Sequence, residues 1–136
     1  MNYLSEKEDS VEVRKMYAIY AGIGGDFGGR YFRYFDSYES EDDALEDARE
    51  IAIEEYESYE EGSHGVLSKK ECEEACIDYD EEVESLIDYS AKEVSYEDII
   101  SIGEEEGLDL VIVCKALTKL SKLNKINRRK NNENNK

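Results

Sequence analysis

The placement of acidic residues constrains this chain more than any other feature of its sequence. The formal net charge is −18, and most of it lies in the middle of the chain. Residues 36–62 contain 13 acidic side chains against one basic, and residues 71–106 contain 15 against one. Residues 115–136 contain eight basic side chains against one acidic. The middle of the chain must therefore fold with most of its charged groups facing water.

Length and composition predict one water-facing domain. The 136 residues can bury a modest core without disulfides or metals, and 38% of them are charged. No run approaches the ~18 apolar residues that span a bilayer, and the polar start at Met1–Glu6 does not resemble a signal peptide. With only three cysteines, we expect a reducing, cytoplasmic location. The net charge argues against direct binding to nucleic acid or to a membrane.

The N-terminal third of the chain predicts a β-hairpin. Residues 1–15 are a polar lead-in, and the aromatic and apolar residues 16–20 and 30–35 are typical of strands. The glycine-rich segment 22–29 between them is predicted to be a loop. It is not a dinucleotide-binding loop, because Phe27 stands where the third glycine of that motif belongs and a strand follows it instead of a helix.

Helices are predicted for the rest of the chain. Three of them begin at serines with an acidic residue three positions later, a helix-capping pattern: Ser40 with Asp43, Ser68 with Glu71, and Ser95 with Asp98. The first helix carries an apolar stripe, formed by Leu45, Ala48, Ala52, Tyr56 and Tyr59. The spacing of Val83, Leu86 and Ile87 also predicts helix.

The C-terminal segment allows two interpretations at its start. Residues 110–114 fit a buried strand, but the helical spacing continues to Leu123, so we favour one basic helix that ends near residue 126. Residues 127–136 are predicted to be a disordered tail. The expected fold is therefore α+β: one domain over residues 16–126, with an N-terminal hairpin or small antiparallel sheet packed against three to five helices.

A row of carboxylates on the predicted 40–61 helix is the most informative candidate site. Like charges four residues apart destabilise a helix by roughly 0.2–0.5 kcal/mol per pair, so a surface shaped only by stability would interleave lysines. One interpretation is a row of negative charge that resembles a phosphate strand; the other is an ordinary solvated face. The row consists of Asp43, Asp47, Glu50, Glu54, Glu57 and Glu61.

Aromatic residues near the row are candidate contacts. Tyr56 and Tyr59 lie close to it in the sequence, and tyrosine is favoured at interfaces because it is rigid and amphipathic. The strand tyrosines are expected to line a core. Phe27 lies at the tip of the glycine-rich loop, where it is a second candidate contact.

Metal binding and catalysis find little support in the sequence. His64, Cys72, Cys76 and Cys114 are the residues from which a zinc site would have to be assembled, but they lack paired C-x-x-C spacing. Buried free cysteines are the commoner outcome. Nothing marks a nucleophile, and no acid/base pair can be located among so many carboxylates. We therefore expect no metal, no cofactor and no enzymatic activity.

The basic segment from Lys115 to Lys130 has three interpretations. It contacts nucleic acid or a partner, it folds back onto the acidic helices, or it only aids solubility. Folding back is attractive because opposite charges in one chain are at a high effective concentration.

Two segments resemble a known family. The predicted strand–loop–strand over residues 16–36 resembles the opening of ArdA-type antirestriction proteins, and residues 54–65 resemble their acidic, tyrosine-bearing helix and glycine turn. The resemblance covers about the first half of the chain, and the basic end departs from it. It implies a non-enzymatic DNA-mimic dimer that blocks restriction enzymes in the cytoplasm of a bacterial host cell.

Together these observations favour an inhibitor that occludes the basic groove of a nucleic-acid-handling defence protein, either a restriction or a CRISPR-type nuclease. The expected partner is a basic nucleic-acid-binding protein. The alternative is a protein-interaction or ligand-sequestering module that uses the glycine-rich loop and the tyrosines, with acidity serving solubility only.

Overall fold

The structure is a computed structural model that describes residues 13–62 and 66–134. It contains three strands, β1 (Lys15–Ile23), β2 (Gly29–Tyr38) and β3 (Ile87–Glu93), and a short 3-10 turn, η1 (Gly25–Phe27), between the first two. Its helices are α2 (Glu41–Gly62), α3 (Lys69–Glu74), α4 (Tyr79–Leu86), α5 (Tyr96–Glu106) and α6 (Leu110–Asn134). The α+β fold, with a hairpin and five helices among the described residues, agrees with the prediction.

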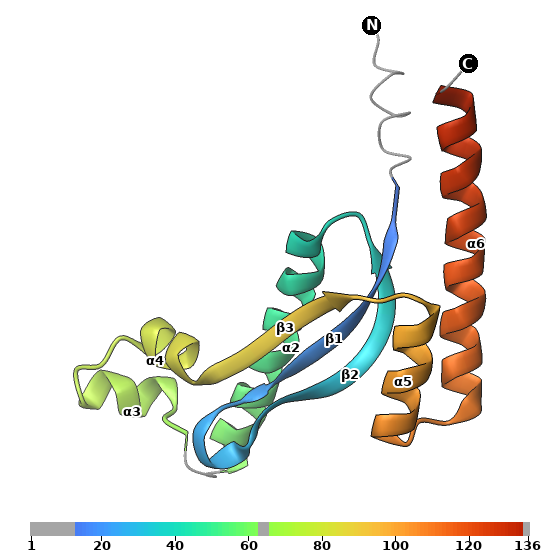
Figure 1. Cartoon of the computed structure of the whole chain (residues 1–136). Coiled ribbons are helices and arrows are strands. Elements are labelled where there is room, and N and C mark those ends of the chain that lie inside the picture. Colours follow the sequence, from blue (N-terminus) through green and yellow to red (C-terminus); the bar gives the residue numbers. More distant parts are fainter. Residues whose placement is uncertain (1–12, 63–65, 135–136) are drawn as a thin grey trace, which may run out of the picture.

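The three strands form one antiparallel sheet in the order β2-β1-β3, with β1 in the centre (Figure 1). Side chains of a strand alternate between the two faces, so a central strand that is buried on both faces must be apolar throughout. In β1, Tyr17 and Ile19 are buried on one face and Met16 and Ala18 on the other. The strand segment at 16–20 therefore forms the centre of the core.

Helix α2 covers one face of the sheet. Small residues repeat every four positions along its inner side at Ala44, Ala48 and Ala52, so the helix backbone can lie close to the sheet. Tyr56 continues this stripe one turn later and is fully buried. The predicted apolar stripe is thus correct for Ala48, Ala52 and Tyr56.

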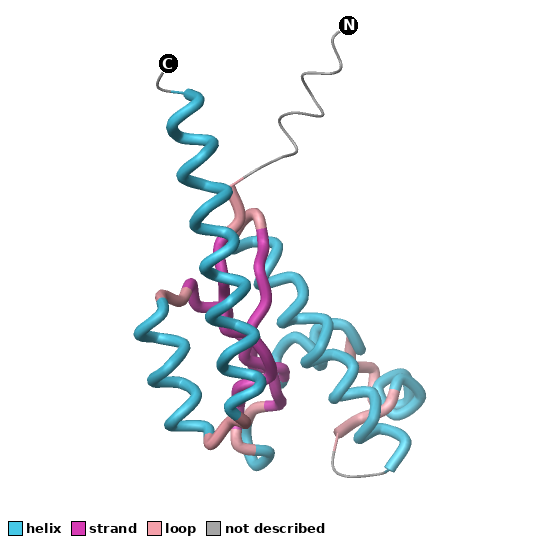
Figure 2. The backbone as a smooth tube through the Cα atoms, turned by 90° about the vertical axis from the view of Figure 1, so that its right-hand side faces the viewer, coloured by secondary structure: helices cyan, strands magenta, loops and turns pink. Residues whose placement is uncertain are grey.

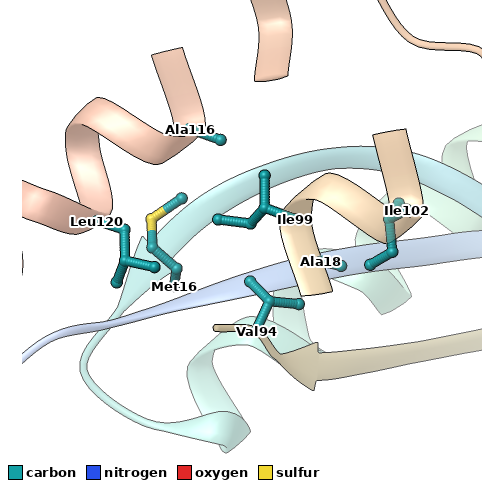
Figure 3. Packing of buried hydrophobic residues seen from close by; sticks show 7 residues of the cluster. All are labelled: Met16, Ala18, Val94, Ile99, Ile102, Ala116 and Leu120. Carbon is teal, nitrogen blue, oxygen red and sulfur yellow. The ribbon is translucent and has the colours of Figure 1, made fainter. Parts of the chain in front are cut away.

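Helices α5 and α6 cover the other face, where Figure 3 shows Met16 and Ala18 of the sheet meeting residues of both helices. Ile99 and Ile102 come from α5, and Leu120 from α6. The protein therefore has three layers, with the strands between α5–α6 on one side and α2 on the other (Figure 2). The C-terminal half of α6 extends beyond the other elements.

Several predicted boundaries agree with the structure. The serines at the three predicted helix starts all accept the capping hydrogen bond, from the backbone N–H groups of Asp43, Glu71 and Asp98. The segment at 110–114 is helix, as favoured, and not strand. The helix continues to Asn134, so the boundary predicted at residue 127 lies inside α6. β1 begins at Lys15, at the end of the predicted lead-in.

Strand β3 corrects the sequence interpretation. Ile87 was predicted to continue a helix with Leu86, but α4 ends at Leu86 and Ile87 begins β3. Ile87 pairs with Ile23 at the end of β1, where it joins the buried cluster beneath α2. Pairing with β1 therefore overrides the local helical spacing.

None of the described helices is both long and apolar enough to cross a membrane.

Gly22 is required by the close approach of β1 and β2. A Cβ at this position would lie 2.5 Å from the backbone oxygen of Gly29, and β1 is held on its other side by the pairing of Gly22 with Asp88. We expect Gly22→Ala to lower the free energy of unfolding by about 3 kcal/mol in denaturant titration. Gly25→Ala is the control, because its Cβ meets nothing within 4 Å and only the positive φ costs about 1 kcal/mol. Equal losses for both variants would contradict the close approach.

Candidate functional site

Three glutamates of the predicted row, Glu50, Glu54 and Glu57, line the outer side of α2 and are exposed. Their spacing of four and three residues keeps them on one side of the helix, away from the buried alanine stripe. Among the described residues, none of the three lies in an ion pair. They also lie in the interior of a 22-residue helix, where the helix dipole does not favour acid. The fold therefore gives no stabilising reason for their charge.

The other three members of the row differ from these glutamates. Asp43 lies in the first turn of α2, where a carboxylate is favoured by the helix dipole. Asp47 is half-buried and accepts a hydrogen bond of 2.8 Å from the hydroxyl of Tyr38. The side chain of Glu61 lies outside the described part. The candidate row is therefore reduced from six residues to Glu50, Glu54 and Glu57.

Many other acidic residues have a structural role. Glu71, Asp78 and Asp98 bind backbone N–H groups at helix starts. The carboxylate of Asp98 accepts hydrogen bonds from Ser95, and these hold its pKa below the usual value. Further acids lie in ion pairs with basic residues: Asp36, Glu39, Glu55, Glu84, Asp88 and Glu93. Contacts within the fold explain why these positions are acidic. The three glutamates of α2 have no such explanation.

The two tyrosines predicted as partner contacts have different environments in the structure. Tyr56 is fully buried and donates a hydrogen bond of 2.9 Å to the backbone oxygen of Leu67. Its side chain cannot reach a partner, so its assignment to the contact surface is corrected to a core role. Tyr59 is half-buried, and the centre of its ring lies 4.8 Å from the centre of the Phe27 ring. The hairpin turn therefore rests against the C-terminal part of α2 on its inner side, with the apolar stripe and away from the row.

Helix α4 carries further acidic residues and contacts α2. α4 is tied to α2 by the ion pair of Arg49 and Glu84, whose atoms are 2.8 Å apart. Asp80 and Glu81, in the first turn of α4, are exposed. This ion pair uses the only basic side chain within α2. Arg49 is therefore held by Glu84 of α4 and does not neutralise the row.

A groove that the sequence interpretation missed lies between β2 and α2. Arg33 donates to Glu55 over 2.8 Å, and the hydroxyl of Tyr31 donates to the same carboxylate. Arg33 and Glu55 are only 25% and 15% exposed, and the guanidinium lies 4.5 Å from the centre of the Tyr31 ring. Tyr31, predicted to line the core, is instead 50% exposed at this groove. The two arginines of the β2 segment were the available signal, but nothing local indicated a partner on α2.

A chain of hydroxyls links the sheet to α2. The Tyr34 and Tyr38 oxygens lie 3.2 Å apart, and Tyr38 donates to Asp47. Burial raises the pKa of Tyr38, and its hydrogen bonds to Tyr34 and Asp47 raise it further. Burial also raises the pKa of Tyr17, Tyr20 and Tyr34.

These raised pKa values predict alkaline destabilisation. The folded protein keeps tyrosine protons that the unfolded chain loses near pH 10, so stability is intact below that pH and falls above it. Each such proton contributes a slope of about −1.4 kcal/mol per pH unit. Denaturant titrations above pH 10 should show this loss, and Tyr38→Phe should remove up to one proton from the slope. An unchanged slope would contradict the role of Tyr38.

The residues considered for zinc are not brought together. Cys72 is buried in α3 and Cys76 is exposed two residues after that helix, while Cys114 is exposed on α6 in the opposite layer. His64 lies outside the described residues. No group of three or more His, Cys, Asp or Glu side chains in the described part is arranged to hold a metal ion.

The basic helix does not fold back onto α2. α6 lies on the opposite side of the sheet, and its one ion pair among the described residues joins Lys119 to Asp36 of β2 over 2.6 Å. Acidic and basic surfaces are thus separated by the sheet, and the outer face of α2 stays open to a partner.

Comparisons with protein-family models, curated proteins and solved structures found no match for this chain. The resemblance to antirestriction proteins therefore stays a prediction that rests on the residues alone.

Proposed function

We propose that the chain is a non-enzymatic inhibitor whose acidic α2 surface occupies the basic groove of a nucleic-acid-handling defence protein. The observation that supports this best is the row of Glu50, Glu54 and Glu57, which are exposed in mid-helix without a basic partner among the described residues. Their two neighbouring like-charge pairs cost the helix roughly 0.2–0.5 kcal/mol each. No contact within the described fold offsets this cost, and basic side chains of a binding partner supply the missing favourable interaction.

The spacing of the row suits a groove that binds phosphates. Glu50 and Glu57 lie about 10.5 Å apart along the axis at ~1.5 Å per residue, so the row carries one charge every ~5 Å. One DNA strand carries one charge per ~3.4 Å of axis. The row is sparser than DNA but of the same order. Lysines and arginines placed to bind phosphates would therefore find carboxylates within reach.

The groove around Tyr31, Arg33 and Glu55 supports a second candidate, a module that binds a ligand or peptide. Its exposed tyrosine ring offers a contact surface. However, the charges of Arg33 and Glu55 already neutralise each other. This favours the acidic row as the binding surface.

Inhibition assays on restriction and CRISPR-type nucleases test the proposal. DNA cleavage by a sensitive nuclease should be blocked by the purified chain, and the block should weaken steeply from low to moderate salt. Tyr31→Ala should leave it unchanged. Inhibition that is insensitive to salt but abolished by Tyr31→Ala would instead support the groove.

A further inference from the structure

The outer side of the α5–α6 layer carries apolar side chains that no described element covers. In the first turn of α6, Leu110 and Val111 are 77% and 61% exposed, and Ile100 of α5 is 46% exposed. Val111 lies nine residues from the buried Leu120, or about half a turn round the helix, so it points away from the sheet. A shallow, open surface runs along this side of α6 from Leu110 to Lys122. Clustered apolar exposure of this kind marks an interaction surface.

The charge of this layer indicates which partner fits it. Residues 96–134, which form α5 and α6, contain seven acidic and seven basic side chains, whereas α2 contains 11 acidic and one basic. Two copies of a chain with net charge −18 repel each other over most of their surface. The balanced α5–α6 face is where that repulsion is smallest.

The two helices also complement each other across such a contact. α5 presents exposed acids, such as Glu97 and Glu104, and α6 presents exposed lysines, such as Lys115 and Lys122. A two-fold axis that brings α5 of one copy onto α6 of the other pairs acid with base twice, because an isologous contact repeats each interaction. The apolar residues then lie in the centre and the charged residues at the rim, as in stable interfaces.

We infer that a second copy of this chain docks on the α5–α6 face, so that the two helical pairs form a four-helix layer. The sheet separates this face from α2 (Figure 2), so the dimer leaves both acidic α2 surfaces free. The inference does not depend on the proposed function.

Substitutions in the apolar centre of the proposed contact test it, with dimerisation of the full chain measured by sedimentation equilibrium. The native chain should form dimers, and Ile100→Asp or Val111→Asp should weaken dimerisation at least about tenfold. Circular dichroism should stay unchanged, because both side chains are exposed. Ile77→Asp is the matched control, since Ile77 is an exposed isoleucine between α3 and α4.

A charge exchange tests the pairing of α5 with α6. One variant carries Glu97→Lys and Glu104→Lys, and the other carries Lys115→Glu and Lys122→Glu. Each alone should lose dimerisation, because its two helices then repel in the contact, while an equal mixture should form a one-to-one heterodimer. A native chain that stays monomeric, a dimer lost only with Ile77→Asp, or a mixture that stays monomeric would each overturn the inference.

Discussion

Replacing Tyr56 by alanine should lower the free energy of unfolding by about 3–5 kcal/mol, enough to unfold a marginally stable domain. Tyr56 is fully buried under the sheet, and its ring packs edge-on against Tyr79 at 6.1 Å. Its hydroxyl also binds the backbone oxygen of Leu67, just after the end of α2. Removing the side chain leaves a cavity and an unpaired carbonyl together. Thermal and denaturant unfolding measure the loss.

Two further variants separate these contributions. Tyr56→Phe keeps the ring and removes the hydroxyl with its hydrogen bond to Leu67, so it should cost about 1–2 kcal/mol. Tyr59→Ala is the matched control three residues along the same helix, and it should cost less because Tyr59 is only half-buried. If Tyr56→Ala cost no more than Tyr59→Ala, the core role of Tyr56 would be wrong.

Neutralising Glu50, Glu54 and Glu57 together as glutamines should weaken binding to the inhibited nuclease at least about 100-fold. The same change should raise the free energy of unfolding by roughly 0.5–1 kcal/mol, because it removes two like-charge pairs from α2. Opposite effects on binding and stability would distinguish a functional surface from a structural one. Affinity is measured by titration at fixed salt, and stability by denaturant unfolding.

The C-terminal end of α5 and the turn after it provide a matched control. Glu105, Glu106 and Asp109 are also three exposed acids, and they lie in the layer opposite α2. Changing these three to the corresponding amides alters the net charge by the same amount, but it should leave affinity for the nuclease within about threefold, because distant charges are screened by salt. If this triple variant lost binding and the α2 variant kept it, the α2 surface would not be the binding site.

Much of the fold could be predicted from local sequence. The capping serines at Ser40, Ser68 and Ser95 each act on a backbone group three residues away, so the sequence alone contains both partners. Strand β3 could not be predicted in this way. Residues 87–93 alternate poorly, and they form a strand because β1 offers a free edge beside them.

The candidate site was predicted only in outline, because long-range contacts decide which side chains are free. Helical spacing placed Asp47 and Glu50 in the same row, but only the fold brings Tyr38 against Asp47. The same applies to the pairing of Arg33 with Glu55 across 22 positions. Tyr56 and Tyr59 are three residues apart, yet only Tyr56 points fully into the core.

The most direct test of the account is competition between this chain and duplex DNA for the inhibited nuclease. If the α2 surface occupies the groove that binds DNA, the concentration of chain needed for half-maximal binding should rise in proportion to the DNA added, and excess DNA should displace the chain completely. If saturating DNA left binding of the chain unchanged, the acidic surface would not occupy the DNA groove, and the proposed function would be wrong.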